Sequence, residues 1–514
     1  MSSALEKGRT SEDNVSAELH SPERRALEKK LLRKIDLRMS ILIVIYILNY
    51  IDRNNAAAAR KRGLETDLKL KGQEFPTLLS ILYVGYIIMQ IPSNMFLNWI
   101  GRPSLCTTSF FIFFPSWLIR TQKDLPACMM IWGMISCLTG VPSVPIFLRA
   151  LIFISGITTN FVGALLTRFF LGFVEAAFFP GALFLLSKWY KRDEIGLRTA
   201  ILYCGNIISN AFGSLMASGI LAGMQGKLGH DAWRWLFFIE GALTVFVAAT
   251  AIFILPDFPA TSKWLSPEER ELALLRMTED AGVGDQSETE HGGPLTGLWL
   301  ALSDWRVWWL AFALTAQVVA LSFNAYFPTL SATLLFNPTV TLLLCAPPFA
   351  VAALAAFLLA QRVGERCYHM CASFGLGILG FVIAISTMNT AARYISLFLM
   401  AQSYAGLWVR PILILDSREG CKRLFSYVSW MSNSFPRPPS KRAVALALMN
   451  AFSQLGNIAG EYVWPTTYAI CIACSGTTII MCFLFRLSLI SANRKLDQEE
   501  EEQGVKTRGF RYIL

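Results

Sequence analysis

The sequence predicts an all-α, polytopic membrane protein whose twelve transmembrane helices form two bundles of six. Of the 514 residues, 54% are hydrophobic and only 16% are charged, a balance that would leave a soluble protein with far too much exposed apolar surface. Apolar segments close to the ~20 residues that cross a bilayer recur on both sides of one long polar connection. The net charge of +10 fits Lys- and Arg-rich cytoplasmic loops, and no basic run is interleaved with base-stacking aromatics, so no nucleic acid is expected as a partner.

The N-terminal half begins with a polar tail and continues with six expected spans. Residues 1–36 end in a run of Lys and Arg, which favours a cytoplasmic tail and no cleavable signal peptide. The N-terminal six-helix bundle is expected over 37–256. Its spans are expected near 37–55, 76–99, 125–140, 161–181, 199–223 and 234–256.

The C-terminal half repeats this plan after a cytoplasmic central loop at 257–303. In that loop Ser266, Pro267 and Glu269 form a capping-box pattern, which predicts a short surface helix. The second bundle is expected over 304–487, followed by a cytoplasmic tail at 488–514. Its spans are expected near 304–328, 339–360, 371–389, 392–406, 443–463 and 466–487. Two matching halves with a site between them are typical of secondary transporters.

Two opposite charges lie inside the fourth span. Arg168 and Glu175 are two helical turns apart, so they share one face and are separated by roughly 10 Å along the axis. Because an ionised residue at membrane depth costs about 2.5–3.5 kcal/mol, both side chains are expected to face the bundle interior or a wet cavity. They form either a structural ion pair between helices or a site that handles protons or substrate.

Other chemistries find little support in the sequence. Most of the eleven cysteines lie in apolar runs, where they act as small hydrophobes, and Cys471 and Cys474 are expected to pack inside a span. The four histidines are not clustered with Cys or carboxylates, so no metal or cofactor is expected. No nucleophile–base set is visible, so the protein is not expected to be an enzyme.

The charged motifs of the first and fourth spans resemble those of a known family. Asp52-Arg53 at the end of the first span, together with Arg168 and Glu175, resembles the major facilitator superfamily. More narrowly, the chain is similar to the anion:cation symporter family, especially fungal allantoate-, nicotinate- and pantothenate-type permeases. Further matching motifs are at 259–266, 322–328 and 433–442, and the likeness extends over about 37–487.

This resemblance implies roles for the charged residues. Asp52 and Glu175 match protonation sites, and Arg168 matches the partner of these acids. Arg53 matches the residue that binds the substrate carboxylate, for which its planar guanidinium is suited. Six further side chains are candidates to line the cavity and bind substrate, or else to join helices: Tyr83, Asn206, Gln317, Asn324, Asn450 and Gln454.

The function implied is proton-coupled symport of a small organic anion by alternating access. The protein is expected to be a monomer in the plasma membrane with both termini in the cytoplasm. The alternatives are a nutrient sensor on the same fold that transports nothing, and an inactive product of a mis-spliced gene.

Three segments depart from the family pattern, at about 106–124, 141–156 and 407–426. In each, family-like sequence stops and then resumes after the foreign residues. We interpret these segments as translated introns of a predicted gene, and genuine elaboration is the alternative. A cDNA that retains all three would contradict the intron interpretation.

Overall fold

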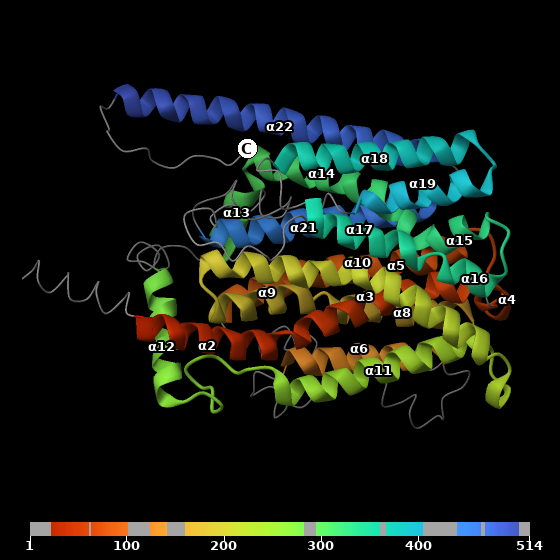
Figure 1. The fold of residues 1–514 in the computed structure, drawn as a ribbon, viewed down its shortest axis with the longest axis horizontal. Coiled ribbons are helices and arrows are strands. Elements are labelled where there is room, and N and C mark those ends of the chain that lie inside the picture. The colour runs from red at the N-terminus through yellow and green to blue at the C-terminus, as the bar shows by residue number, and fades with distance from the viewer. Residues whose placement is uncertain are drawn as a thin grey trace, which may run out of the picture.

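The computed structural model describes most of the chain as helices that run along one common axis (Figure 1). The residues described are 22–60, 63–100, 124–140, 160–281, 294–359, 366–404, 439–463 and 468–502. No strand occurs in these ranges. The three segments that depart from the family pattern lie outside the described residues, except for Asp124 at the start of one helix.

Each span expected in the N-terminal half corresponds to a helix. The spans are α3 (Ile41–Arg60), α5 (Glu74–Ile100), α6 (Asp124–Gly140), α8 (Phe161–Glu175) with α9 (Phe178–Trp189), α10 (Arg192–Gly223) and α11 (Ala232–Ile254). Short elements α4 (Leu64–Asp67) and η3 (Lys227–Gly229) lie between spans. Within this bundle α5 packs on α8, α6 on α11, and α3 on both α10 and α11.

The C-terminal half has a second set of helices. They are α13 (Pro294–Leu302), α14 (Trp305–Leu321), η4 (Ser322–Tyr326), α15 (Phe327–Ala332), α16 (Pro338–Leu343), α17 (Ala346–Leu359), α18 (Arg366–Ser386), α19 (Thr390–Gln402), α21 (Pro439–Val463) and α22 (Tyr468–Glu502). Here α14 packs on α21 and α22, and α18 packs on α19 and α22. The two halves meet where α5 packs on α21 and α10 packs on α16 and α17.

Several helices are long and apolar enough to cross a membrane. Among the described residues, four continuous helical segments satisfy this by length and composition: Phe161–Trp189, Ala232–Ile254, Trp305–Ala332 and Tyr468–Glu502. Large apolar side chains such as Phe246, Phe253 and Leu354 are exposed on the outside of the helices. These surfaces suit a lipid environment, and the protein is an integral, multi-pass membrane protein.

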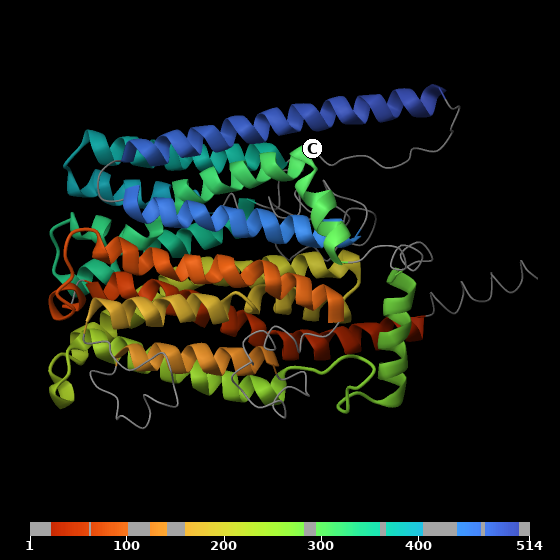
Figure 2. The same cartoon turned by 180° about the vertical axis from the view of Figure 1, so that it is seen from behind.

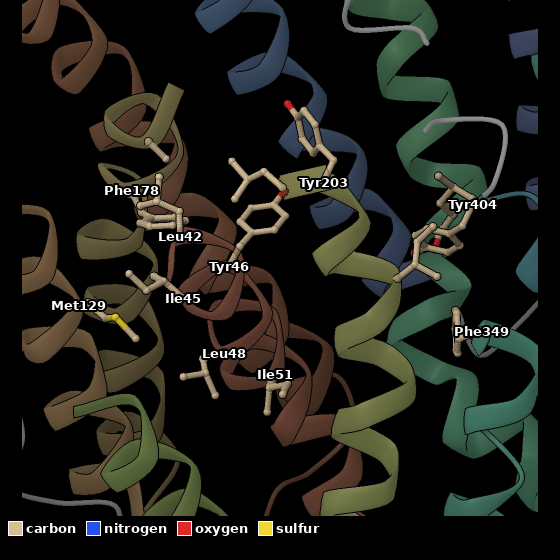
Figure 3. Close-up of a cluster of buried hydrophobic side chains, with 14 of the residues drawn as sticks. Leu42, Ile45, Tyr46, Leu48, Ile51, Met129, Phe178, Tyr203, Phe349 and Tyr404 are labelled. Atoms are coloured by element: carbon tan, nitrogen blue, oxygen red, sulfur yellow. The ribbon is translucent and has the colours of Figure 1, made fainter. Parts of the chain in front are cut away.

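The aromatic core of the first half continues to the interface between the halves. Figure 3 shows Tyr46 of α3 between Phe178 of α9 and Tyr203 of α10, with Tyr404 and Phe349 of the other half nearby. The ring of Tyr46 lies 6.2 Å from that of Phe178 and 6.1 Å from that of Tyr203. Core packing of this kind fixes the helices that carry the polar residues of the interface.

Some helices extend beyond the expected bounds. Helix α2 (Pro22–Met39) forms within the expected polar tail, and α10 begins at Arg192 rather than near 199. The central-loop helix α12 (Pro267–Ala281) has the expected capping box. The Ser266 hydroxyl accepts from the Glu269 amide at 3.2 Å, and the Glu269 carboxylate accepts from the Ser266 amide at 3.3 Å. Contacts with α12 stabilise helix α2, because Arg24 and Lys34 form ion pairs with Glu279 and Glu269 of α12 at 2.5 Å each.

Candidate functional site

A cavity of about 180 Å³ lies between the two halves. Helices α3, α5, α8, α9 and α10 line one wall, and α14, η4 and α21 line the other. The first wall is rich in aromatic rings, whereas the second is rich in amides. The lining includes Tyr50, Arg53, Tyr83, Tyr86, Glu175 and Asn206 on one side, and Gln317, Asn324, Asn450, Gln454, Asn457 and Glu461 on the other. Such a cavity suits a small polar molecule.

An ion pair occupies the first wall. Nε of Arg53 donates to Oε2 of Glu175 at 2.6 Å, and their side chains are 9% and 0% exposed. The Arg53 guanidinium also lies 4.7 Å from the ring centre of Tyr86 and 5.2 Å from that of Tyr50. The other Glu175 oxygen, Oε1, has no hydrogen-bond partner among the described residues. The pair therefore offers the cavity a guanidinium and an incompletely bonded carboxylate.

Two prolines place polar groups on the cavity walls. Because Pro180 has no N–H to donate to the Ala176 carbonyl, the fourth span breaks into α8 and α9, and Glu175 becomes the last residue of α8. Pro328 acts in the same way on the Asn324 carbonyl, and the seventh span passes through the 3₁₀ turn η4. Both breaks lie at the cavity.

Asp52 lies away from this cavity although it is next to Arg53. Its carboxylate accepts from the Ser136 hydroxyl of α6 and the Thr244 hydroxyl of α11, both at 3.1 Å, and the residue is fully buried. Successive residues of a helix point about 100° apart, so Arg53 faces the other half while Asp52 faces the interior of its own bundle. The two expected protonation sites thus have different surroundings.

Arg168 binds the main chain of α3. Its Nη1 donates to the carbonyl oxygens of Asp52 and Arg53 at 3.2 and 3.4 Å, and its Nη2 donates to Asn55 at 2.6 Å. The resemblance implied that Arg168 is the partner of the acids. In the described chain, Glu175 instead pairs directly with Arg53, and Arg168 holds the backbone that carries Asp52 and Arg53.

The six candidate cavity residues named from the sequence all line the cavity. One of them also joins helices, since Asn324 donates to Asn210 of the other half at 3.1 Å. Gln454 accepts from Asn457 of the same helix at 2.8 Å. Gln317 is fully buried, and neither its Oε1 nor its Nε2 has a partner in the described part of the chain.

Two buried glutamates are not among the residues predicted from the sequence. Glu461 of α21 lines the cavity and is 2% exposed, and Glu240 of α11 lines a smaller cavity of about 40 Å³ beside Asn54 and Asn55. Each is a carboxylate within a predicted span, so the rule that drew attention to Glu175 would also have found them. No group of three or more His, Cys, Asp or Glu side chains that could hold a metal ion occurs within the described ranges.

Comparison with known proteins agrees with the fold. The chain is 28% identical to the MFS-type transporter cnsO of Penicillium expansum over 459 residues, covering 86% of this chain and 77% of the relative. It is 30% identical over 402 residues to a putative tartrate transporter of Agrobacterium vitis, covering 76% of this chain and 82% of the relative. The solved proton:xylose symporter XylE is similar in fold, with a TM-score of 0.56 and 14% identity, and the match covers 89% of this chain and 96% of XylE.

The match to a family profile covers most of the chain. The sequence profile of the Major Facilitator Superfamily matches residues 42–461, a range that includes both walls of the cavity. The members of this family that the chain resembles are transporters and not enzymes. The protein is therefore a secondary transporter that belongs to the Major Facilitator Superfamily.

Proposed function

We propose that this transporter carries a small organic anion together with protons, and that it belongs to the anion:cation symporter branch of its superfamily. The observation that supports this most strongly is the buried pair of Arg53 and Glu175 in the cavity wall. Arg53 provides a planar donor for a substrate carboxylate, and Glu175 provides a group that can be neutralised by a proton.

Competition for Arg53 would couple the two ligands. With Glu175 ionised, its carboxylate occupies the guanidinium at 2.6 Å, so an incoming anion would have to displace it and leave a buried charge unpaired. A proton on Glu175 removes that charge and releases Arg53 for the substrate carboxylate. The cavity therefore favours the anion and the proton together over either one alone. The same exchange in reverse would release both on the other side of the membrane by alternating access.

Asp52 and Arg168 would form a second site that couples proton binding to anion binding. Asp52 is buried against two hydroxyl donors, and a change in its protonation would alter the contacts of α3 with α6 and α11. Arg168 holds the carbonyl oxygens of Asp52 and Arg53. We propose that this link transmits proton binding at Asp52 to the orientation of Arg53.

The substrate is proposed to be a small carboxylate. The cavity of about 180 Å³ admits a small molecule, and Tyr83, Asn206, Gln317, Asn324, Asn450 and Gln454 supply hydrogen bonds around it. One relative is named a putative tartrate transporter, which is consistent with an organic anion. We further propose a monomer in the plasma membrane, with bundles at 37–256 and 304–487 and both termini in the cytoplasm.

Reconstitution tests the proposal directly. Proteoliposomes containing the full chain are given an inward pH gradient and a panel of labelled carboxylates that includes nicotinate, pantothenate, allantoate and tartrate. We expect at least one to accumulate above its external concentration and a protonophore to abolish the accumulation. Uptake that does not depend on the pH gradient would contradict proton coupling. Substrate binding without transport would favour a sensor.

A further inference from the structure

The second wall of the cavity contains a buried carboxylate to which the proposed transport cycle gives no role. Glu461 of α21 is 2% exposed and lines the cavity, and its Oε2 has no hydrogen-bond partner among the residues described. Its backbone carbonyl is fixed, because the Tyr326 hydroxyl donates to it at 2.8 Å. A buried carboxylate oxygen without a hydrogen bond lowers the stability of the fold. Because this oxygen belongs to a residue that lines the cavity, a ligand in the cavity could donate the missing hydrogen bond.

Gln317 lines the same wall of the cavity as Glu461. Gly456 of α21 packs against Val318 of α14, and Gly460 packs against Ser322, so the two helices touch along this stretch. Gln317 and Glu461 then lie five to six residues apart, roughly 8 Å, along the packed pair. Both polar atoms of the Gln317 side chain are buried without a partner within the described ranges, so this amide can accept as well as donate.

The opposite charge faces this wall. Arg53 and Glu461 line the central cavity together, and both also line a narrow crevice of about 20 Å³ beside Tyr83. One small molecule in the cavity can therefore reach a guanidinium on one side and a carboxylate on the other. If Glu175 takes up a proton, the cavity contains one positive and one negative side chain. A simple anion would then leave one negative charge in excess, whereas a molecule with a carboxylate and a positive N–H group would leave none.

We propose that Glu461 and Gln317 form a subsite that accepts hydrogen bonds from the substrate. The preferred substrate is then a carboxylate that also carries an N–H donor, either a cationic nitrogen or an amide. This rests on the proposed binding of the carboxylate at Arg53. A site whose buried acceptors are satisfied only by the correct ligand discriminates strongly against an analogue that lacks the donor. Glu461 is thus a specificity determinant rather than a group that carries a proton.

Isosteric pairs of ligands test the proposal by binding alone. The full chain in nanodiscs is titrated with γ-aminobutyrate against pentanoate, N-acetylglycine against 4-oxopentanoate, and N-benzoylglycine against 4-oxo-4-phenylbutanoate. Within each pair only the nitrogen differs. We expect the N–H member to bind about tenfold more tightly in the pairs that fit the cavity. The proposal is overturned if no N–H member binds more tightly than its isostere, including the case in which none binds.

Variants assign the preference to Glu461. Glu461→Gln keeps the shape of the side chain and one neutral acceptor. The binding ratio, which is the affinity for the N–H member of a pair divided by that for its isostere, should therefore fall to about threefold. Glu461→Met should bring this ratio to about one. Glu240→Gln removes a buried carboxylate of the other half that lines a different cavity, and should leave the ratio unchanged. An unchanged ratio in both Glu461 variants would contradict the subsite.

Transport assays separate this inference from the proposed function. Glu461→Gln should still accumulate its best ligand in response to a pH gradient. If it binds with the wild-type ratio but loses pH-driven accumulation, Glu461 carries a proton and the subsite is refuted, while proton-coupled transport stands. If the wild type shows the binding preference but no pH-driven uptake, the coupling proposal fails and the subsite stands.

Discussion

Arg53 and Asp52 are neighbours in sequence, yet they serve two different polar regions. Arg53 faces the cavity between the halves, and Asp52 faces hydroxyl groups inside its own bundle. The guanidinium of Arg168 bonds to the carbonyl oxygens of both residues. A single helical turn of α3 therefore joins the cavity to the bundle interior, and a change at either residue is transmitted through the backbone that they share.

Replacement of Arg53 tests the substrate contact. Arg53→Lys keeps a positive charge but loses the planar, bidentate donor, so the affinity for the transported anion should fall at least tenfold. Arg53→Ala should abolish binding, since the buried Glu175 would then repel the anion. Titration of the purified variants in nanodiscs checks both. Wild-type affinity in Arg53→Ala would mean that the carboxylate binds elsewhere.

At the level of elements, glycines allow α5 and α8 to approach closely. A Cβ at Gly172 would overlap the Leu82 carbonyl, and one at Gly85 would overlap the Phe169 carbonyl, so each helix presents a glycine to the backbone of the other. This contact sets the position of α8 and hence of Glu175 at its end. Small residues at such crossings are common in membrane helices.

Gly172→Ala should therefore destabilise the first bundle. The backbone of α5 must move to admit the methyl group, and overpacking of this kind typically costs about 1–3 kcal/mol. Thermal unfolding of the purified protein should show a lower midpoint. Gly476→Ala in α22 is the matched control, because nothing lies within 4 Å of a Cβ at that position. Equal midpoints for the two variants would contradict the close-packing account.

Helix α12 is attached to the first half by charged contacts that depend on pH. Burial disfavours the charged form of Glu279, but its bonds to Arg24 at 2.5 Å and Lys191 at 3.1 Å outweigh this and lower its pKa. A lowered folded-state pKa stabilises the docked helix above the unfolded value of about 4.3 and loses this contribution as the pH falls through the folded pKa.

Amide hydrogen exchange of α12 tests this attachment. Protection of the helix should fall on acidification below about pH 4.3, and Glu279→Gln should reduce protection at pH 7. The exposed Glu271 of the same helix has no ion pair among the described contacts, so Glu271→Gln serves as the control. The attachment account fails if both variants retain wild-type protection at neutral pH.

The two halves also touch near the ends of their helices. The hydroxyls of Thr77 at the start of α5 and Tyr462 at the end of α21 lie 2.9 Å apart, and the Ser218 hydroxyl of α10 donates to the Thr339 carbonyl of α16 at 3.0 Å. Figures 1 and 2 show this as the end of the molecule that carries α4, α15 and α16, opposite to α12. In the proposed cycle the cavity can open at this end only if α5 and α21 separate.

A cross-link between α5 and α21 should therefore stop transport. Cysteines introduced together at Thr77 and Tyr462, and joined by a bifunctional methanethiosulfonate reagent that replaces the length of the tyrosine ring, should abolish uptake, and a reductant should restore it. Each single substitution in the same background should transport in both conditions. Uptake at the wild-type rate by the cross-linked protein would show that this contact need not open.

Much of the whole-molecule fold follows from apolar periodicity, because a bilayer demands helices of set length. The capping box at Ser266 likewise predicts where α12 begins. The helical phase places Arg168 and Glu175 on one face, but it does not reveal which neighbour each side chain meets. The pairing of Glu175 with Arg53 and the turn of Arg168 toward backbone carbonyls depend on how α3 and α8 cross, which only the packed structure defines.

The most direct test of the account is proton-coupled transport by Glu175→Gln in proteoliposomes. The variant keeps the shape of the side chain but carries no titratable proton, and Arg53 remains available to the anion. We expect it to exchange external for internal substrate at a substantial fraction of the wild-type rate, and to lose accumulation driven by an inward pH gradient. Accumulation equal to that of the wild type would contradict the exchange of proton and anion at Arg53 and Glu175.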